Sequence, residues 1–232
     1  MLTVRSATER GHAHHGWLES HHTFSFADYY DPRHMGWSAL RVINDDTVQP
    51  AHGFPTHAHR DMEIISYVLE GELAHKDSTG TGAVIRPGDV QLMSAGRGVQ
   101  HSEFNPSPRD PVHFLQIWIE PKFTGVAANY QQKFFDPSEK RGQLRLLVSE
   151  DGRDESLKMW QDARLYATLL DGSEHVEYEI APGRRGYVHV ARGDVTLNGQ
   201  RLRAGDGVKI QDTQTVSLSE GKNAEVLLFD LP

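Results

Sequence analysis

One pattern of strands and glycine turns occurs twice in this chain, and it limits the fold more than any other feature. Residues 67–90, YVLEGELAHKDSTGTGAVIRPGDV, align with residues 189–208, HVARGDVTLNGQRLRAGDGV. In both copies a strand, a glycine turn, a second strand and an RPGD or RAGD turn follow in the same order, although the second copy is shorter. A repeated supersecondary unit indicates two related structures within one chain. We therefore expect two related β-barrels.

The segments around the repeat predict short strands and few helices. Residues 63–78 and 82–96 each predict two strands, which break at a Glu-Gly and at a Pro-Gly-Asp turn, and residues 112–121 predict one strand. Residues 38–45, SALRVIND, predict a strand that ends in an Asn-Asp-Asp turn, and the polar residues 129–145 are expected to cross between the halves. Because no segment has a long 3.6-residue periodicity, the chain is expected to be all-β with few short helices.

The composition leaves histidine and carboxylate side chains as the candidates for metal chemistry. The 232 residues include no cysteine, which excludes disulfides, thiolate nucleophiles and cysteine-type zinc sites, but they include 14 histidines. The net charge of −8, without a visible basic stripe, argues against direct nucleic-acid binding. The first residues lack the apolar core of a secretory signal, and no apolar run could span a membrane. A cytoplasmic protein without membrane contact is therefore expected.

Two short segments have the spacing of a metal site. THAHRDMEI (56–64) contains His57 and His59, and GRGVQHSEFNP (96–106) contains His101 and Glu103. A proline before the first segment and IISYVL after it favour a strand, in which residues i and i+2 share one face. If the two strands are neighbours, three imidazoles and one carboxylate converge, a donor set that suits Fe, Mn, Co, Ni, Cu or Zn. An octahedral metal would keep two open positions, for a bidentate substrate or for substrate and dioxygen together.

The second copy of the repeat tests this interpretation. When the alignment is extended toward the N-terminus, His57 falls on Glu179 and His59 falls on Ala181. The turns are retained but the imidazoles are lost, so the histidines are not needed to build the β unit. We expect a single metal site, in the first half of the chain.

The remaining histidines and the large aromatic residues are interpreted as structural or solvated. His52 and His113 are close enough in sequence to the predicted ligands to contact them, although a structural role is favoured. His75 has no matching partner. The following aromatic residues are assigned to the core: Trp17, Phe24, Phe26, Trp37 and Trp118.

The motif residues resemble the cupin superfamily and, more narrowly, the pirin family. GFPTHAHRDMEIISYVLEG resembles the first cupin motif, G…HxHxxxE…G, and Gly98, His101 and Asn105 match the second, GxxHxxxN. Pirin segments are similar to RGHAHHGWLESHHTFSFADYYDP, MGWSALRVINDD, THAHRDMEI, MSAGRGVQHSE and LLFDLP, which are spread over most of the chain. The resemblance to bacterial pirins with quercetin 2,3-dioxygenase activity is close.

The resemblance implies a bicupin of two antiparallel, jelly-roll-type β-barrels. Residues 1–135 would form a metal-binding domain and residues 136–232 a domain without metal ligands. The ligands that it implies are His57, His59, His101 and Glu103. In cupins generally the carboxylate belongs to the first motif, here Glu63, whereas in pirins it follows the third histidine by two residues. Glu103 is therefore expected on the metal and Glu63 in a supporting or structural role, while Asp61 is expected to make a hydrogen bond or to face solvent.

The resemblance also implies an activity. It is a metal-dependent dioxygenase reaction in which O2 opens the heterocycle of a flavonol such as quercetin and carbon monoxide is released. The metal would act as a Lewis acid on the substrate hydroxyl group, and Glu103 would accept the proton as the catalytic base. One divalent transition metal is expected, iron first, with nickel, copper, cobalt, manganese or zinc as the others that the ligands accept.

Two other functions stay open from the sequence. One is a metal- or redox-sensing regulatory protein without turnover, which would act through protein partners. The other is a different cupin reaction on a small chelating substrate.

Overall fold

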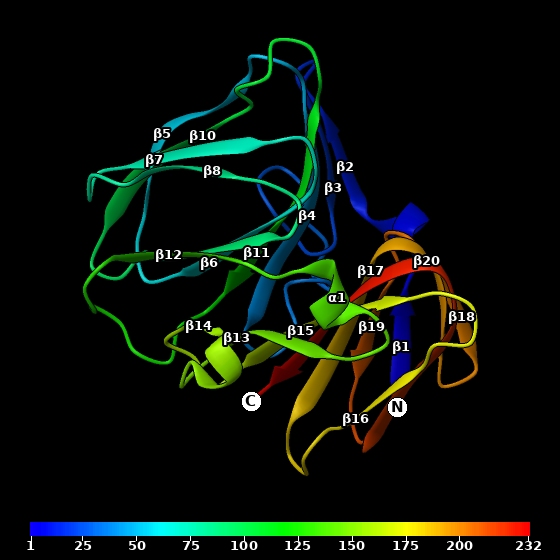
Figure 1. The fold of residues 1–232 in the computed structure, drawn as a ribbon. Helices are drawn as coiled ribbons and strands as arrows, with labels where there is room; N and C mark the ends of the chain where they lie inside the picture. The colour runs from blue at the N-terminus through cyan, green and yellow to red at the C-terminus, as the bar shows by residue number, and fades with distance from the viewer.

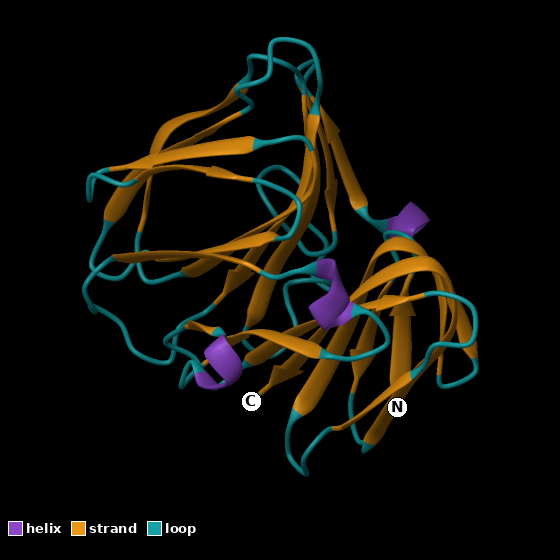
Figure 2. Ribbon diagram, in the orientation of Figure 1, coloured by secondary structure: helices purple, strands orange, loops and turns teal.

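Twenty β-strands make up most of the regular structure of the computed structural model, which describes residues 1–232. The single α-helix, α1 (Pro137–Lys140), is one turn long, and two 3-10 turns cover Ala7–Glu9 and Arg153–Glu155. The prediction of an all-β chain with few short helices is confirmed (Figure 2). None of these helices has the length or the apolar character that crossing a bilayer requires.

The N-terminal half consists of two sheets. Its strands are β2 (Gly11–His14), β3 (Leu18–His22), β4 (Leu40–Val48), β5 (Gly53–His59), β6 (Glu63–Glu70), β7 (Leu73–Asp77), β8 (Gly82–Ile85), β9 (Asp89–Ser94), β10 (Val99–Phe104), β11 (Val112–Ile119) and β12 (Asn129–Phe134). One sheet has the order β12-β9-β6-β11-β4-β3-β2, and the other has the order β5-β10-β7-β8. In Figure 1 the four-stranded sheet lies across from the seven-stranded one.

The C-terminal half is built from one extended sheet. Its strands are β1 (Leu2–Arg5), β13 (Arg145–Ser149), β14 (Leu157–Lys158), β15 (Arg164–Leu170), β16 (Val176–Glu179), β17 (Arg185–Leu197), β18 (Gln200–Arg203), β19 (Gly207–Ile210) and β20 (Thr215–Leu231). The order is β1-β19-β17-β20-β15-β13-β14, with β16 paired to β20 and β18 paired to β17. The long strand β17 bends at register shifts, so that its first part pairs with β19 and its second part with β18.

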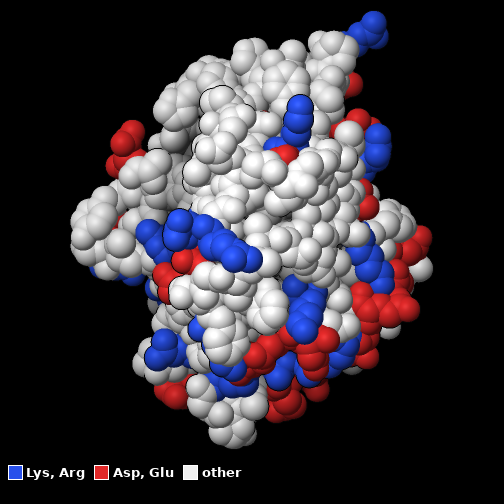
Figure 3. All heavy atoms as spheres, turned by 90° about the vertical axis from the view of Figure 1, so that its left-hand side faces the viewer, with Lys and Arg blue, Asp and Glu red and all other residues white.

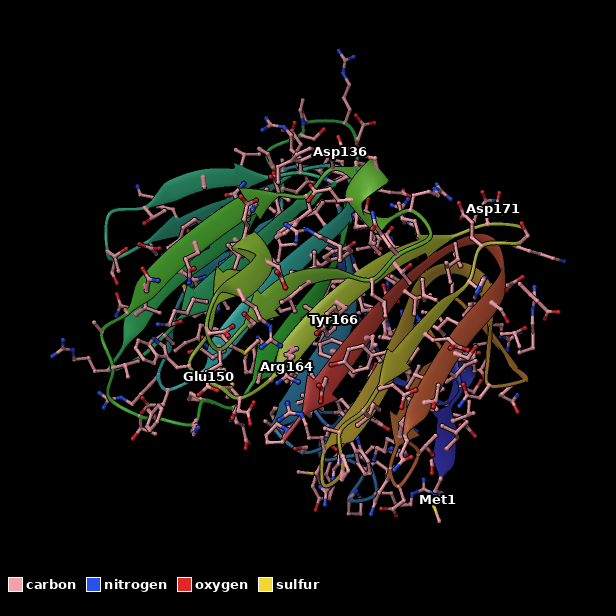
Figure 4. The ribbon with its side chains drawn as sticks, turned by 60° about the horizontal axis from the view of Figure 1, so that its bottom comes forward. Met1, Asp136, Glu150, Arg164, Tyr166 and Asp171 are labelled. Carbon is pink, nitrogen blue, oxygen red and sulfur yellow. The ribbon has the colours of Figure 1, made fainter.

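The chain crosses between the halves more than once. Strand β1, which begins beside Met1, pairs with β19 in the C-terminal sheet, while α1 follows Asp136 where the chain leaves the N-terminal half (Figure 4). Arg164 and Tyr166 lie on β15, which pairs with β13 and β20 (Figure 4). The division of the chain at residues 135 and 136 stays a prediction.

The two halves repeat the same pairing, residue by residue. Tyr67 pairs with Val90 in the first half, and His189 pairs with Gly207 in the second, which are the partners that the sequence alignment superimposes. The hairpin of β7 with β8 likewise corresponds to that of β17 with β18. The internal repeat is therefore confirmed, and the halves form cupin-type β-sandwiches whose sheets stay open at their edges.

Two local predictions were wrong. Residues 44–46, expected to be a turn, lie inside β4, because that strand is paired on both sides, with β3 and β11. Residues 129–134, expected to belong to a crossover, form β12, which pairs with β9. In both places tertiary pairing satisfies the backbone groups of polar residues that local rules assign to turns.

The distribution of apolar side chains leaves room for a polar site in the N-terminal half. The largest apolar cluster, of 25 buried residues, joins the halves through residues such as Ile65, Ile117 and Phe229. The C-terminal interior holds a cluster of 15, whereas the N-terminal half has two smaller ones, of 7 and 4. On β6, Ile64 belongs to one small cluster, Val68 to the other, and the buried Ser66 lies between them on the same face.

Candidate metal centre

Three histidines from two neighbouring strands converge in the N-terminal half. Strands β5 and β10 pair antiparallel, with His57 directly opposite His101, and His59 two residues farther along β5. The ligand nitrogens of the three side chains lie within 4.8 Å of one another, and His57 Nε2 is 3.0 Å from His101 Nε2. The prediction that the two strands are neighbours and bring the imidazoles together is confirmed.

The hydrogen bond of His57 fixes which of its nitrogens faces the cluster. His57 Nδ1 lies 2.8 Å from the carbonyl oxygen of Pro55, which can only accept. The proton is therefore assigned to Nδ1, and Nε2 is left with its lone pair toward the other two imidazoles.

Behind His101 lies a chain of polar side chains that sequence reasoning missed. His101 Nδ1 is 3.4 Å from His75 Nδ1, and His75 Nε2 is 2.9 Å from Asp77 Oδ2. Asp77 accepts through Oδ1 from the backbone amide and hydroxyl group of Thr79, so its position is fixed by the turn after β7. A proton on His75 Nε2 for Asp77 and a proton on His101 Nδ1 for His75 leave His101 Nε2 free as a ligand. His75, which was given no partner, is thus part of the centre.

Two of these imidazoles, His59 and His101, have pKa values well below neutral pH. Burial, and next the charge of His57, lower the pKa of His59 to about 4. The same two causes, followed by His59 and His75, lower the pKa of His101 to about 3. Neutral imidazole is the form that binds metal ions, so the centre is ready to bind a cation without displacing a proton from these two rings.

Glu103 lies beside His101 and is hydrogen-bonded to residues of the opposite sheet. Its Oε2 accepts a 2.8 Å hydrogen bond from Gln116 Nε2, and its Oε1 lies 3.2 Å from Ser66 Oγ. The carboxylate groups with His75 and His101 within 4.8 Å, and it lines the same pocket as His57 and His59. Burial raises the pKa of Glu103, against the hydrogen bond from Gln116.

Glu63 lies away from this cluster. Asp61 has a left-handed backbone, φ +46°, between β5 and β6, so the strand alternation of His57 and His59 does not continue to Glu63. Glu63 Oε2 accepts a 2.7 Å hydrogen bond from Ser94 Oγ, and burial raises its pKa to about 7. Its role in the structure is to pair with Ser94. Asp61 accepts from the Gly125 amide at 2.7 Å, as expected of a residue outside the ligand set.

A row of polar side chains crosses the seven-stranded sheet opposite the histidines. Cross-strand pairs join His22 to Asn44, Asn44 to Gln116, Gln116 to Ser66, and Ser66 to Gln91. All five are buried. The row makes the face of the seven-stranded sheet that lies opposite the histidines polar.

A pocket of about 670 Å³ opens onto the centre. The assignment of the aromatic residues to the core is confirmed for Phe24 and Trp37, which belong to or pack on the largest apolar cluster. Trp17 and Trp118 pack on the two smaller apolar clusters, as assigned, but they also line the pocket. The assignment was wrong for Phe26, which lines the pocket. The Trp118 ring stands edge-on to that of His59 at 5.0 Å and to that of Phe26 at 5.3 Å. A flat aromatic molecule would therefore meet aromatic side chains next to the histidines.

The same positions carry different side chains in the second half. Glu179 pairs with Thr215 as His57 pairs with His101, and Thr215 Oγ1 donates a 2.7 Å hydrogen bond to Glu179 Oε1.

The structural interpretation of two other histidines is supported, because His52 Nδ1 bonds the carbonyl of Pro50 and His113 Nε2 bonds Asp45.

Charged residues of both signs are mixed on the face shown in Figure 3, where large areas have no charged side chain. That the chain does not bind nucleic acid directly stays a prediction.

Comparison with known proteins finds relatives that match the chain over its whole length. Residues 3–119 match the family described as Pirin, and residues 146–231 match the quercetinase C-terminal cupin domain. The chain is 49% identical to a quercetin 2,3-dioxygenase of Escherichia coli (strain K12), over 100% of this chain and 99% of that protein. It is 43% identical to a pirin-like protein of Caulobacter vibrioides, over 99% of each.

Solved structures give the same result. A crystal structure of the bacterial pirin YhhW from Escherichia coli in complex with nickel(II) is 48% identical and covers 100% of this chain and 99% of that one, with a TM-score of 0.95. The sequence motifs, the sandwich pair and these matches together show that the chain belongs to the pirin family.

Proposed function

We propose that this protein is a metal-dependent dioxygenase that cleaves flavonols such as quercetin. The observation that carries the proposal is the convergence of His57, His59 and His101 beside a pocket that is lined by His57, His59 and aromatic rings. The relatives named quercetin 2,3-dioxygenase, which match the chain over its whole length, support the choice of substrate.

The residues of the centre fit one divalent transition metal. His57, His59, His101 and Glu103 would hold it, since three neutral imidazoles and a buried carboxylate are donors for borderline cations. Iron is the first expectation, and nickel is supported by the nickel(II) in the related pirin. When bound, the metal would supply Lewis acidity that lowers the pKa of the substrate's 3-hydroxyl group.

Glu103 would accept the proton of that hydroxyl group. Burial increases the affinity of its carboxylate for a proton, and Gln116 holds one of its oxygens in place. In the overall reaction the heterocycle opens, both oxygen atoms of O2 enter the product ester, and one ring carbon leaves as carbon monoxide.

The pocket would orient the flavonol. Trp118 and Phe26 present aromatic edges and faces on one side, and the polar residues of the seven-stranded sheet lie across from the histidines. Burial of the ring system would also exclude water from the reacting carbons.

The test combines metal analysis with turnover. Purified protein should contain about one transition metal ion per chain and should bleach the quercetin absorption band in air with release of carbon monoxide. His59→Ala should lose both the metal and the reaction, whereas His175→Ala, at an exposed histidine of the C-terminal half, should lose neither. Metal-loaded wild-type protein that leaves quercetin unchanged would rule out this substrate.

A further inference from the structure

A second group of histidines lies outside the pocket centre, on the ladder between β2 and β3. His12 pairs with His21 and His14 pairs with Glu19. Because side chains alternate along a strand, these four share one face of the ladder, while Ala13 and Ser20 point to the other. Strand β2 is the edge of its sheet, and His12 and His14 are exposed.

The polar atoms of this group are already close together. His12 Nε2 is 2.5 Å from Glu19 Oε1, and His14 Nδ1 is 2.6 Å from Glu19 Oε2. The rings of His12 and His21 stack with their centroids 4.8 Å apart. The ligand atoms of His12, Glu19 and His21 all lie within 4.8 Å of one another.

We propose that His12, Glu19 and His21, with His14 beside them, form a second binding site for a borderline divalent cation such as Zn²⁺, Ni²⁺ or Cu²⁺. Two imidazoles and one carboxylate are ligands that these ions accept, and the paired strands fix the spacing of the three side chains. The proposal does not depend on the pocket centre or on its reaction, because none of these residues belongs to that centre.

Exposure sets the character of the second site. The side chains of His12 and His14 are 51% and 61% exposed and that of Glu19 is 39% exposed, so open coordination positions would be filled by water. With three or four ligands and no buried carboxylate, this site is weaker than the pocket centre. His12 also lines the pocket, whereas His14, Glu19 and His21 do not.

The alternative is that Glu19 only accepts hydrogen bonds from two surface histidines. Such exposed pairs contribute little to stability and need no cation. The two explanations differ in stoichiometry, because only a site adds a second bound ion per chain.

Calorimetric titration of metal-free protein with Zn²⁺ alone separates them. The wild type should bind two ions per chain, one tightly and one more weakly, and the double variant His12→Asn/His21→Asn should bind one. The control His175→Asn removes an exposed imidazole elsewhere and should keep both ions. If wild type and the double variant bind the same number of ions, the proposal is wrong.

A second measurement distinguishes failure of the second site from failure of the proposed function. His57→Ala/His59→Ala removes two imidazoles of the pocket centre, and this variant should still bind one Cu²⁺ with nitrogen hyperfine lines in its electron paramagnetic resonance spectrum. Adding His12→Asn/His21→Asn to it should abolish that signal. A Cu²⁺ spectrum that the added substitutions leave unchanged would overturn the second site, whatever the pocket centre does.

Discussion

Gln116 donates a 2.8 Å hydrogen bond to Glu103, and this bond links the two sheets of the N-terminal sandwich. Gln116 lies on β11 in the seven-stranded sheet, and Glu103 lies on β10 in the four-stranded sheet. Ser66 Oγ stands 3.2 Å from both Glu103 Oε1 and Gln116 Oε1, so its single proton serves one of them at a time. The orientation of the carboxylate is therefore set by residues of the opposite sheet.

Gln116→Leu is expected to weaken metal binding about 10- to 100-fold, as removal of outer partners of a metal ligand typically does. The substitution conserves size but leaves Glu103 buried without its amide donor. Metal dissociation constants by competition with a chelator provide the measurement, with Gln200→Leu, at an exposed position on β18, as the control. Equal affinities for wild type and Gln116→Leu would show that the amide does not position the carboxylate.

Asp77→Asn is expected to change the tautomer of His101. The asparagine can keep its carbonyl oxygen toward Thr79, but its NH2 group then faces His75 Nε2, which can no longer donate. His75 would turn its proton to Nδ1, and His101 would lose its acceptor there.

The readouts for Asp77→Asn are ring ¹⁵N chemical shifts of the histidines and metal affinity, which should fall by about 10-fold or more. Asp212→Asn, at an exposed loop position, is the control. Unchanged ring shifts for His101 would contradict the proposed chain of hydrogen bonds.

Phe26→Ala is expected to raise the KM for quercetin about 10-fold with little effect on kcat or on bound metal. The ring lines the pocket and contacts Trp118 edge-to-face, so its loss removes aromatic contact area worth about 1–1.5 kcal/mol. Steady-state kinetics with a metal assay on the same samples provide the test. Phe123→Ala, which removes an exposed ring, is the matched control, and an equal KM in both variants would mean that Phe26 does not contact the substrate.

The parts of the centre that the sequence predicted are those encoded locally. His57 with His59, and His101 with Glu103, are each two residues apart, so strand geometry alone puts each pair on one face. The internal repeat predicted that the metal site lies in the first half, because the second copy keeps the turns but lacks the imidazoles. These patterns are visible without knowing which strands pair.

The supporting residues could not be found in this way, because their contacts depend on pairing between distant strands. Ser66 and Gln116 are 50 residues apart and meet only through the register of β6 and β11. His75 reaches His101 only because β7 and β10 are neighbours. The available signal was weak: Ser66 and Gln116 each stand between apolar or aromatic neighbours in their strands. The turn predicted at residues 44–46 was wrong for the same reason, because the backbone groups of these residues pair with two neighbouring strands.

Glu63→Gln is expected to make stability less dependent on pH. Burial raises the folded-state pKa of Glu63 to about 7, whereas the unfolded chain has a value of about 4.3. The folded state therefore favours the protonated carboxyl group, and this contribution is fully present below about pH 4 and is lost as the pH rises through 7. Glutamine imitates the protonated form at every pH, so between pH 5 and pH 8 the variant should gain about 2–3 kcal/mol over wild type. Urea unfolding of the metal-free proteins at several pH values measures this, with the exposed Glu177→Gln as the control. If the difference between Glu63→Gln and wild type is the same at pH 5 and pH 8, a raised pKa for Glu63 is excluded.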